Sequence, residues 1–231
     1  MSTTSTALAT ADFRRGVFTL YSQVRAAQDP AHGHRLWAAG RESLLASSPV
    51  SPLLPQHRGS DTRVPVAAYD PSFRFVVPVL PADPRRLEVP TGTDGVVRYE
   101  RIGRVELDGL GSLDVWWHDG YGGGLFVPLR DGLAGSTGYG GGRYVVDTIK
   151  GADLGAGVDS RLVLDLNFAY HPSCAYDPAW ACPLAPPGNV LAAAVPIGEL
   201  YQGPWAHRAT CIDRSRADPA HQPSMSPFSV R

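Results

Sequence analysis

The spacing of apolar residues divides the chain into a helical start and a longer region of short strands. After Ala11, apolar residues recur at helical intervals with arginines between them, which is typical of an amphipathic helix. The stripe consists of Phe13, Val17, Leu20, Tyr21 and Val24. Asp29 and Pro30 end this helix, and a second helix is predicted over residues 33–46.

Beyond Pro65 the apolar residues form short or alternating runs separated by Gly, Pro and Asp, which predicts strands. The predicted strands are residues 73–80, 96–107, 113–117, 125–129, 144–147, 162–168 and 190–195. Short strands with many turns are typical of antiparallel sheets, and the 25 Gly and 21 Pro support that. The predicted fold class is mostly β (α+β), an antiparallel β-barrel or sandwich with two N-terminal helices.

This pattern also predicts how the 231 residues are organised. Residues 1–10 are expected to be a disordered leader, 11–48 the N-terminal helices, and 49–201 the β domain. Residues 202–231 form a polar extension that wraps the surface or is partly disordered. One domain of this length can bury a core without a metal or a disulfide.

Charge and hydropathy argue against several partners. The formal net charge is −1 and Lys150 is the only lysine, so no basic face for nucleic acid is expected. No window approaches the apolar length of a membrane span, and the N-terminus lacks the pattern of a signal peptide. A cytoplasmic protein without nucleic-acid or membrane partners is expected, and a homodimer is compatible with the sequence.

Residues 165–189 concentrate chemistry in a segment whose prolines prevent a helix. His171 is the candidate for proton transfer near neutral pH, with Asp165 orienting it or pairing with Arg143. Asn167 and Tyr170 are expected beside it at the end of the predicted strand. Alternatively, Asp165 and Asn167 hydrogen-bond the backbone of the Pro-rich loop and His171 is exposed.

Further candidates flank the glycine-rich turns at 120–124 and 138–142. Arg143 could bind an anionic group of a substrate at a barrel mouth, or could pair with Asp131 to tie strands together. Tyr144 and Trp117 could line an apolar pocket or belong to the core. Glu199 is a further carboxylate within reach of such a mouth.

The cysteines leave several interpretations open. Cys174 and Cys182 have seven residues between them, which differs from structural zinc spacing. A metal site with His171, a disulfide, and a Cys174 nucleophile activated by His171 are alternatives to unreactive buried thiols. Unreactive thiols are the simplest interpretation, and no metal is predicted.

A set of spaced motifs covers roughly residues 35–200, at residues 51–53, 69–71, 122–128, 130–131, 135, 139–144, 147–155, 165–189 and 198–199. Together these motifs resemble a bacterial family catalogued as domain of unknown function 1684. It implies a mostly β domain behind N-terminal helices, with shared polar residues but no established reaction. By this resemblance the chain is expected to be a divergent, actinobacterial-type member. The family usually has Asn where this chain has His171 and Glu where it has Gly188, and Gly132 to Ala134 lack two usual hydroxyls.

Two functions follow from these observations. One is a cofactor-independent enzyme that acts on a small organic molecule by acid–base chemistry, such as cyclisation, isomerisation, elimination or hydrolysis. In it, His171, Asp165 and Glu199 would be catalytic, and specialised metabolism is a compatible setting. Arg143, Tyr144, Asn167, Asp131, Tyr170 and Trp117 would bind substrate. The alternative is a non-catalytic β-barrel that binds a small ligand.

Overall fold

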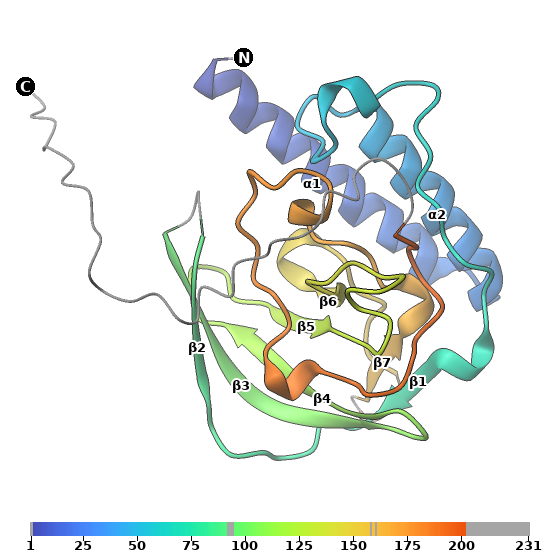
Figure 1. Ribbon diagram of the computed structural model, residues 1–231, viewed down its shortest axis with the longest axis vertical. Coiled ribbons are helices and arrows are strands. Elements are labelled where there is room, and N and C mark those ends of the chain that lie inside the picture. Colours follow the sequence, from blue (N-terminus) through green and yellow to red (C-terminus); the bar gives the residue numbers. More distant parts are fainter. Residues whose placement is uncertain (1, 92–94, 158, 160, 202–231) are drawn as a thin grey trace, which may run out of the picture.

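The computed structural model describes residues 2–91, 95–157, 159 and 161–201. Its first two elements are α1 (Thr3–Ala26) and α2 (Pro30–Ser47), which lie side by side against the β structure (Figure 1). Asp29 caps α2, since its carboxylate accepts the amides of Ala31 and His32 at 3.0 and 3.1 Å. Among the described residues, no helix combines the length and apolar character needed to cross a membrane.

The helix α1 begins earlier than the sequence pattern predicts. The expectation of a disordered leader is wrong for residues 3–10, because they form the first turns of α1. The Ser2 hydroxyl caps the helix by accepting the Ser5 amide at 3.2 Å, and the Thr10 hydroxyl donates to the Thr6 carbonyl at 2.8 Å. These turns carry no apolar stripe, so the periodicity begins only where α1 packs on α2.

Seven strands form two antiparallel sheets in the described part of the chain. Their bounds are β1 (Arg74–Val77), β2 (Arg86–Pro90), β3 (Val96–Leu107), β4 (Gly111–His118), β5 (Leu125–Leu129), β6 (Arg143–Asp147) and β7 (Leu162–Asp165). One sheet has the order β2-β3-β4-β5-β6 and the other pairs β1 with β7. The mostly β fold with two N-terminal helices is thus confirmed.

In the described part of the chain, the two sheets do not close into a barrel. Single bridges join Leu80 to Arg104 and Tyr144 to Tyr170, but neither extends into a ladder. The apolar faces of β3 to β7 enclose one core, and a second core lies between the helices and the large sheet. A sandwich-like arrangement therefore describes the fold better than a barrel.

Several strand predictions differ from the structure. The predicted strand 73–80 is shorter, at Arg74–Val77, and the predicted strand 162–168 ends at Asp165 because Leu166–Phe168 form a 3-10 helix. The strand β2 was not predicted because only two of its residues are apolar and it lies at a sheet edge, with alternate residues exposed. The predicted strand at 190–195 is wrong: Val190 makes a single bridge to Arg130. Leu191 and Val195 are buried in the core without a ladder, so their apolar character reflects packing alone.

Candidate functional site

Glu199 is held in the interior by its backbone. Its amide donates to the Ala169 carbonyl at 2.8 Å, and Val66 forms a bridge with it. The preceding Gly198 has φ +77°, and a Cβ there would lie 2.7 Å from the Ala169 carbonyl oxygen, so only glycine fits. This turn brings the carboxylate of Glu199 beside residues 170–171.

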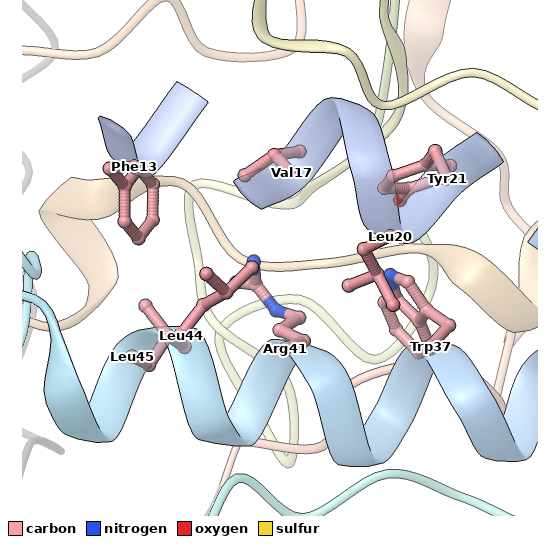
Figure 2. Close-up of a pocket in the computed structure, with 8 residues that line it drawn as sticks. All are labelled: Phe13, Val17, Leu20, Tyr21, Trp37, Arg41, Leu44 and Leu45. Atoms are coloured by element: carbon pink, nitrogen blue, oxygen red, sulfur yellow. The ribbon is translucent and has the colours of Figure 1, made fainter. Parts of the chain in front are cut away.

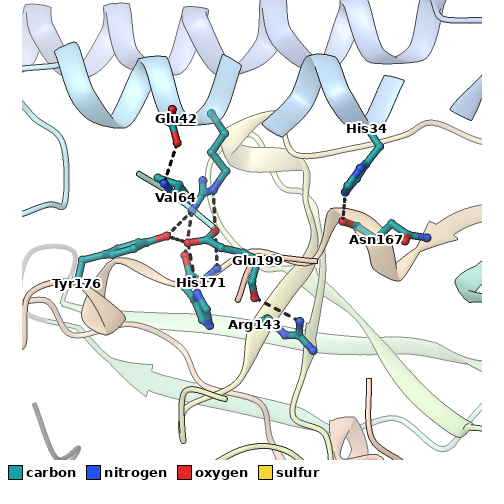
Figure 3. A network of polar contacts seen from close by, with 9 residues as sticks. His34, Glu42, Val64, Arg143, Asn167, His171, Tyr176 and Glu199 are labelled. Carbon is teal, nitrogen blue, oxygen red and sulfur yellow. Dashed lines mark hydrogen bonds and ion pairs between the residues drawn. The ribbon is translucent and has the colours of Figure 1, made fainter. Parts of the chain in front are cut away.

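The Glu199 carboxylate contacts three side chains that can donate a hydrogen bond to it (Figure 3). Arg41 Nε donates to Oε2 at 2.7 Å, His171 Nδ1 lies 3.3 Å from Oε1, and the Tyr176 hydroxyl bonds Oε1. Burial alone would raise the pKa of this carboxyl, but Arg41 and His171 outweigh it and hold the pKa at about 2. We call Arg41, His171, Tyr176 and Glu199 the Glu199 cluster.

His171 is enclosed by aromatic rings. Its side chain is 2% exposed, and the rings of Tyr139, Tyr176 and Tyr201 have centroids 6.1, 6.3 and 5.5 Å from the imidazole. The expectation of an exposed His171 is therefore wrong. Because Nδ1 faces Glu199, Nε2 lies on the far side of the ring from the carboxylate, which is the arrangement of an imidazole oriented by an acid.

Arg41 is the member of the cluster that the sequence reasoning missed. It lies on the buried side of α2 with Trp37 and Leu45, and its guanidinium stacks 4.6 Å from the centre of the Tyr170 ring. An arginine four residues from each of two apolar core positions was the available signal. Arg41 also lines a groove between α1 and α2 (Figure 2), whose free space of about 20 Å³ suits one water molecule.

Asp165 and Asn167 form a separate network. The fully buried Asp165 pairs with Arg74 at 3.0 Å and accepts the Asn167 amide at 3.1 Å, which caps the short helix Leu166–Phe168. Asn167 exchanges two hydrogen bonds of 2.8 Å with the backbone of Asp70. Asp165 thus neither orients His171 nor pairs with Arg143, and the backbone-bonding alternative describes both residues. We call Arg74, Asp165 and Asn167 the Asp165 network.

Arg143 and Asp131 pair with each other in the interior. Arg143 Nη2 donates to Asp131 Oδ2 at 2.8 Å and to the Val195 carbonyl at 2.8 Å, and Nη1 donates to the Ile197 carbonyl. Asp131 also accepts the Val195 amide at 3.1 Å. These contacts connect β6 to residues 195–197, which precede Glu199. They therefore agree with the alternative in which Arg143 pairs with Asp131 and has a structural role.

The aromatic candidates lie in different surroundings. Tyr144 is buried and its hydroxyl donates to the Pro183 carbonyl at 2.7 Å, while Tyr170 contacts Arg41. Trp117 is 42% exposed and packs on Gly123, where a Cβ would come within 2.2 Å of the indole. Of the predicted residues, Glu199 and His171 belong to the Glu199 cluster. Tyr170 lies against Arg41, and Arg143 donates to the Glu199 carbonyl at 3.4 Å.

A further buried polar group lies around Asp114. Its carboxylate binds Arg101 Nη1 at 3.1 Å and Arg104 Nε at 3.0 Å, and its carbonyl accepts the Asn189 amide at 2.8 Å. A Cβ at Gly188 would lie 1.9 Å from Asp114 Oδ2. The glycine at this position is therefore required by the Asp114 carboxylate, which occupies the space that a longer residue 188 would need.

The fold and the cluster together define a mostly β domain with two N-terminal helices, in which Arg41 of α2 binds the buried pair of Glu199 and His171. The family described as "Protein of unknown function (DUF1684)" matches residues 62–200, and the chain belongs to this family, as the resemblance predicted. An uncharacterized protein of Haloarcula marismortui, solved by solution NMR, is 32% identical with a TM-score of 0.50. That match covers 71% of this chain and 89% of the other. A search of curated proteins gives no significant match.

Proposed function

We propose that this protein is an enzyme that acts on a small organic molecule by acid–base chemistry without a cofactor, with His171 as the proton-transfer group. The observation that supports this proposal is the 3.3 Å contact between His171 Nδ1 and the buried Glu199 carboxylate. A carboxylate at Nδ1 favours the tautomer whose Nε2 lone pair can accept a proton. Glu199 is ionised across the neutral range, since its pKa is about 2, and it stabilises the imidazolium.

The other members of the cluster support the same role. Arg41 and the Tyr176 hydroxyl hold the Glu199 carboxylate from two sides, so the imidazole keeps one orientation. His171 would accept a proton from the substrate and return it at another atom, which suits isomerisation, elimination, cyclisation or hydrolysis. The proposal includes a cytoplasmic location and a role in specialised metabolism.

The test compares His171→Asn with His32→Asn, because His32 lies exposed on α2 and gives the same substitution outside the cluster. Purified proteins are incubated with fractions of small-molecule cell extract, and mass spectrometry follows species consumed and formed. We expect His171→Asn to lower turnover more than ~100-fold with folding intact, and His32→Asn to leave it unchanged. Asn is the residue usual in the family at position 171, so the variant should fold.

Two outcomes would contradict the proposal. Equal turnover by His171→Asn and the unchanged protein would remove the imidazole from the chemistry. If no fraction is turned over while a small molecule raises the melting temperature, the protein is the non-catalytic binding module instead.

A further inference from the structure

The five-stranded sheet ends at β2 (Arg86–Pro90). In the described part of the chain no strand pairs with the second side of β2. An edge strand presents unpaired backbone N–H and C=O groups, which can pair with the edge of another chain. The strand at the other end, β6, differs, because Tyr144 exchanges two backbone hydrogen bonds of 2.8 and 2.9 Å with Tyr170. Among the described residues of this sheet, β2 is therefore the edge that is open to a partner.

The hydrogen bonds to β3 determine which backbone groups of β2 point outward. The Arg101 amide donates to the Arg85 carbonyl at 2.8 Å, and the Thr91 amide donates to the Gly95 carbonyl at 2.7 Å. Residues of an antiparallel strand face their partner strand alternately, and β2 and β3 pair in one continuous register. Residues 85, 87, 89 and 91 therefore face β3, whereas residues 86 and 88 direct their N–H and C=O groups away from it.

Two prolines bound this outward-facing stretch. Pro84 and Pro90 occupy the next even-numbered positions on either side, and neither has an N–H to donate. Between them, Arg86 and Glu88 can both donate and accept along the edge. Prolines and charges commonly protect an edge strand from uncontrolled pairing. Here they restrict pairing to a partner that presents complementary groups to these two residues.

Arg86 and Glu88 carry opposite charges on the exposed face of the sheet. Arg86 Nη2 lies 3.1 Å from Glu100 Oε1, and Glu88 Oε1 lies 3.1 Å from Arg98 Nε. The side chains of Arg86 and Glu88 are 84% and 62% exposed, so both retain surface for a second contact. On the other face of the strand, Leu87 is half-buried and packs against the second core.

A second copy of β2 is complementary to this edge in one register. When two copies pair antiparallel with Leu87 opposite the partner's Leu87, each Arg86 lies opposite a Glu88 of the other copy. Each such pair exchanges two backbone hydrogen bonds, and each Pro84 lies opposite a Pro90, where neither residue has an N–H to lose. Moving the centre to Arg86 or to Glu88 would instead place like charges opposite one another, which destabilises a strand pair.

We propose that this protein forms a weak homodimer through β2, in which the two sheets join into one continuous sheet centred on Leu87. The backbone of Arg86 and Glu88 supplies the hydrogen bonds, and their charges fix the register. An interface of one strand pair is small, so we expect a dissociation constant of roughly 10 µM to 1 mM. No member of the Glu199 cluster belongs to β2 or β3, so the homodimer does not depend on the proposed acid–base function.

The first experiment measures the mass of the full chain by sedimentation velocity from about 10 µM to 1 mM, where a concentration-dependent dimer is expected. Arg86→Glu places only acids, and Glu88→Arg only bases, at the pairing positions, so each variant alone should dimerise at least ~10-fold more weakly. An equimolar mixture of the two variants should regain the dimer, because every acid then lies opposite an arginine. The control is Glu106→Arg, a charge reversal at an exposed position of β3 away from this edge, which should leave the dimer unchanged.

A disulfide trap tests the register without changing these charges. The two residues at the centre form a non-hydrogen-bonded pair with Cα atoms about 4.5 Å apart, which a disulfide can span. Leu87→Cys should therefore give, under mild oxidation, a dimer linked through position 87, which mass spectrometry of the linked peptide identifies. Val89→Cys is the matched control on the same half-buried face, because it lies opposite the partner's Arg85 and should link at least ~10-fold more slowly.

Four results would overturn the proposal. The first is a chain that stays monomeric over the whole concentration range. The second is a dimer that both charge reversals leave as strong as before, or a mixture of the two folded variants that stays monomeric. The third is linkage of Val89→Cys as fast as that of Leu87→Cys. The fourth is a disulfide from position 87 to Cys211 of the same chain, a residue outside the described ranges, which would make the C-terminal extension the partner of β2.

Discussion

Two carboxylates of this protein are equally buried but have different kinds of partner. Asp165 is 0% exposed and Glu199 is 2% exposed. Asp165 bonds a backbone amide, an amide side chain and Arg74, so its contacts cap a helix and fix a loop. Glu199 bonds Arg41, the Tyr176 hydroxyl and His171, whose imidazole has a second ring nitrogen on the side away from the carboxylate. Burial of a carboxylate therefore does not by itself distinguish a structural residue from a candidate site residue. The partners of the carboxylate make that distinction.

The largest expected effect tests the structural side of this comparison. Asp165→Ala removes a helix cap and leaves Arg74 and the Asn167 amide without their acceptor, which should cost about 4 kcal/mol of stability. Urea unfolding measures this loss. The control is Asp12→Ala, since Asp12 pairs with Arg15 on the surface and should cost below ~1 kcal/mol. If Asp165→Ala lowered turnover of the folded protein as much as His171→Asn, the distinction between the two carboxylates would fail.

The second effect concerns pH and the Glu199 cluster. The folded pKa of Glu199 is about 2, below the usual 4.5, so its contribution to stability is complete above pH 4.5 and is lost as the pH falls toward 2. The difference corresponds to about 3 kcal/mol. Unfolding free energies measured between pH 5 and pH 2 should show this loss, and Glu199→Gln should remove that part of the slope. An identical slope in the variant would assign the acid sensitivity to other groups.

A third buried carboxylate extends the comparison to packing. Because a Cβ at position 188 would lie 1.9 Å from Asp114 Oδ2, Gly188→Ala must displace a paired carboxylate and should cost about 2 kcal/mol. Gly140→Ala is the control, since its nearest contact would be an ordinary 3.8 Å. Thermal unfolding of both variants measures the difference. Equal melting temperatures would show that the Asp114 network can shift without cost.

The smallest expected effect is that of Tyr176→Phe, which tests whether Tyr176 only holds the Glu199 carboxylate or also transfers a proton. Tyr176→Phe removes a hydroxyl that bonds the Glu199 carboxylate and accepts from Arg41 Nη2 at 2.9 Å. We expect a loss of about 1.5 kcal/mol of stability and a decrease in turnover smaller than that of His171→Asn. Chemical unfolding and the extract assay test both. A decrease as large as that of His171→Asn would make the Tyr176 hydroxyl a proton-transfer group.

Local patterns were sufficient for much of the fold. The strand β5 has the predicted bounds 125–129, because its apolar run is continuous and is bounded by glycine and charged residues. Residues 3–10 could not be recognised as part of α1, since residues 3–8 are exposed and the segment carries no periodic apolar signal. At residues 190–195 an apolar run enters the core as irregular chain, which periodicity cannot distinguish from a strand.

The candidate site shows the same division more clearly. The sequence by itself determined the family and the mostly β class behind two helices, and it predicted His171 and Glu199 as site residues. The tertiary structure alone decided that Glu199, from a turn after Gly198, meets His171, and that Arg41 from α2 completes the cluster. It also separated Asp165 from His171, although both lie in one short segment. The physical reason is that a partner for a buried charge is chosen by chain packing over long sequence separations, which local spacing does not encode.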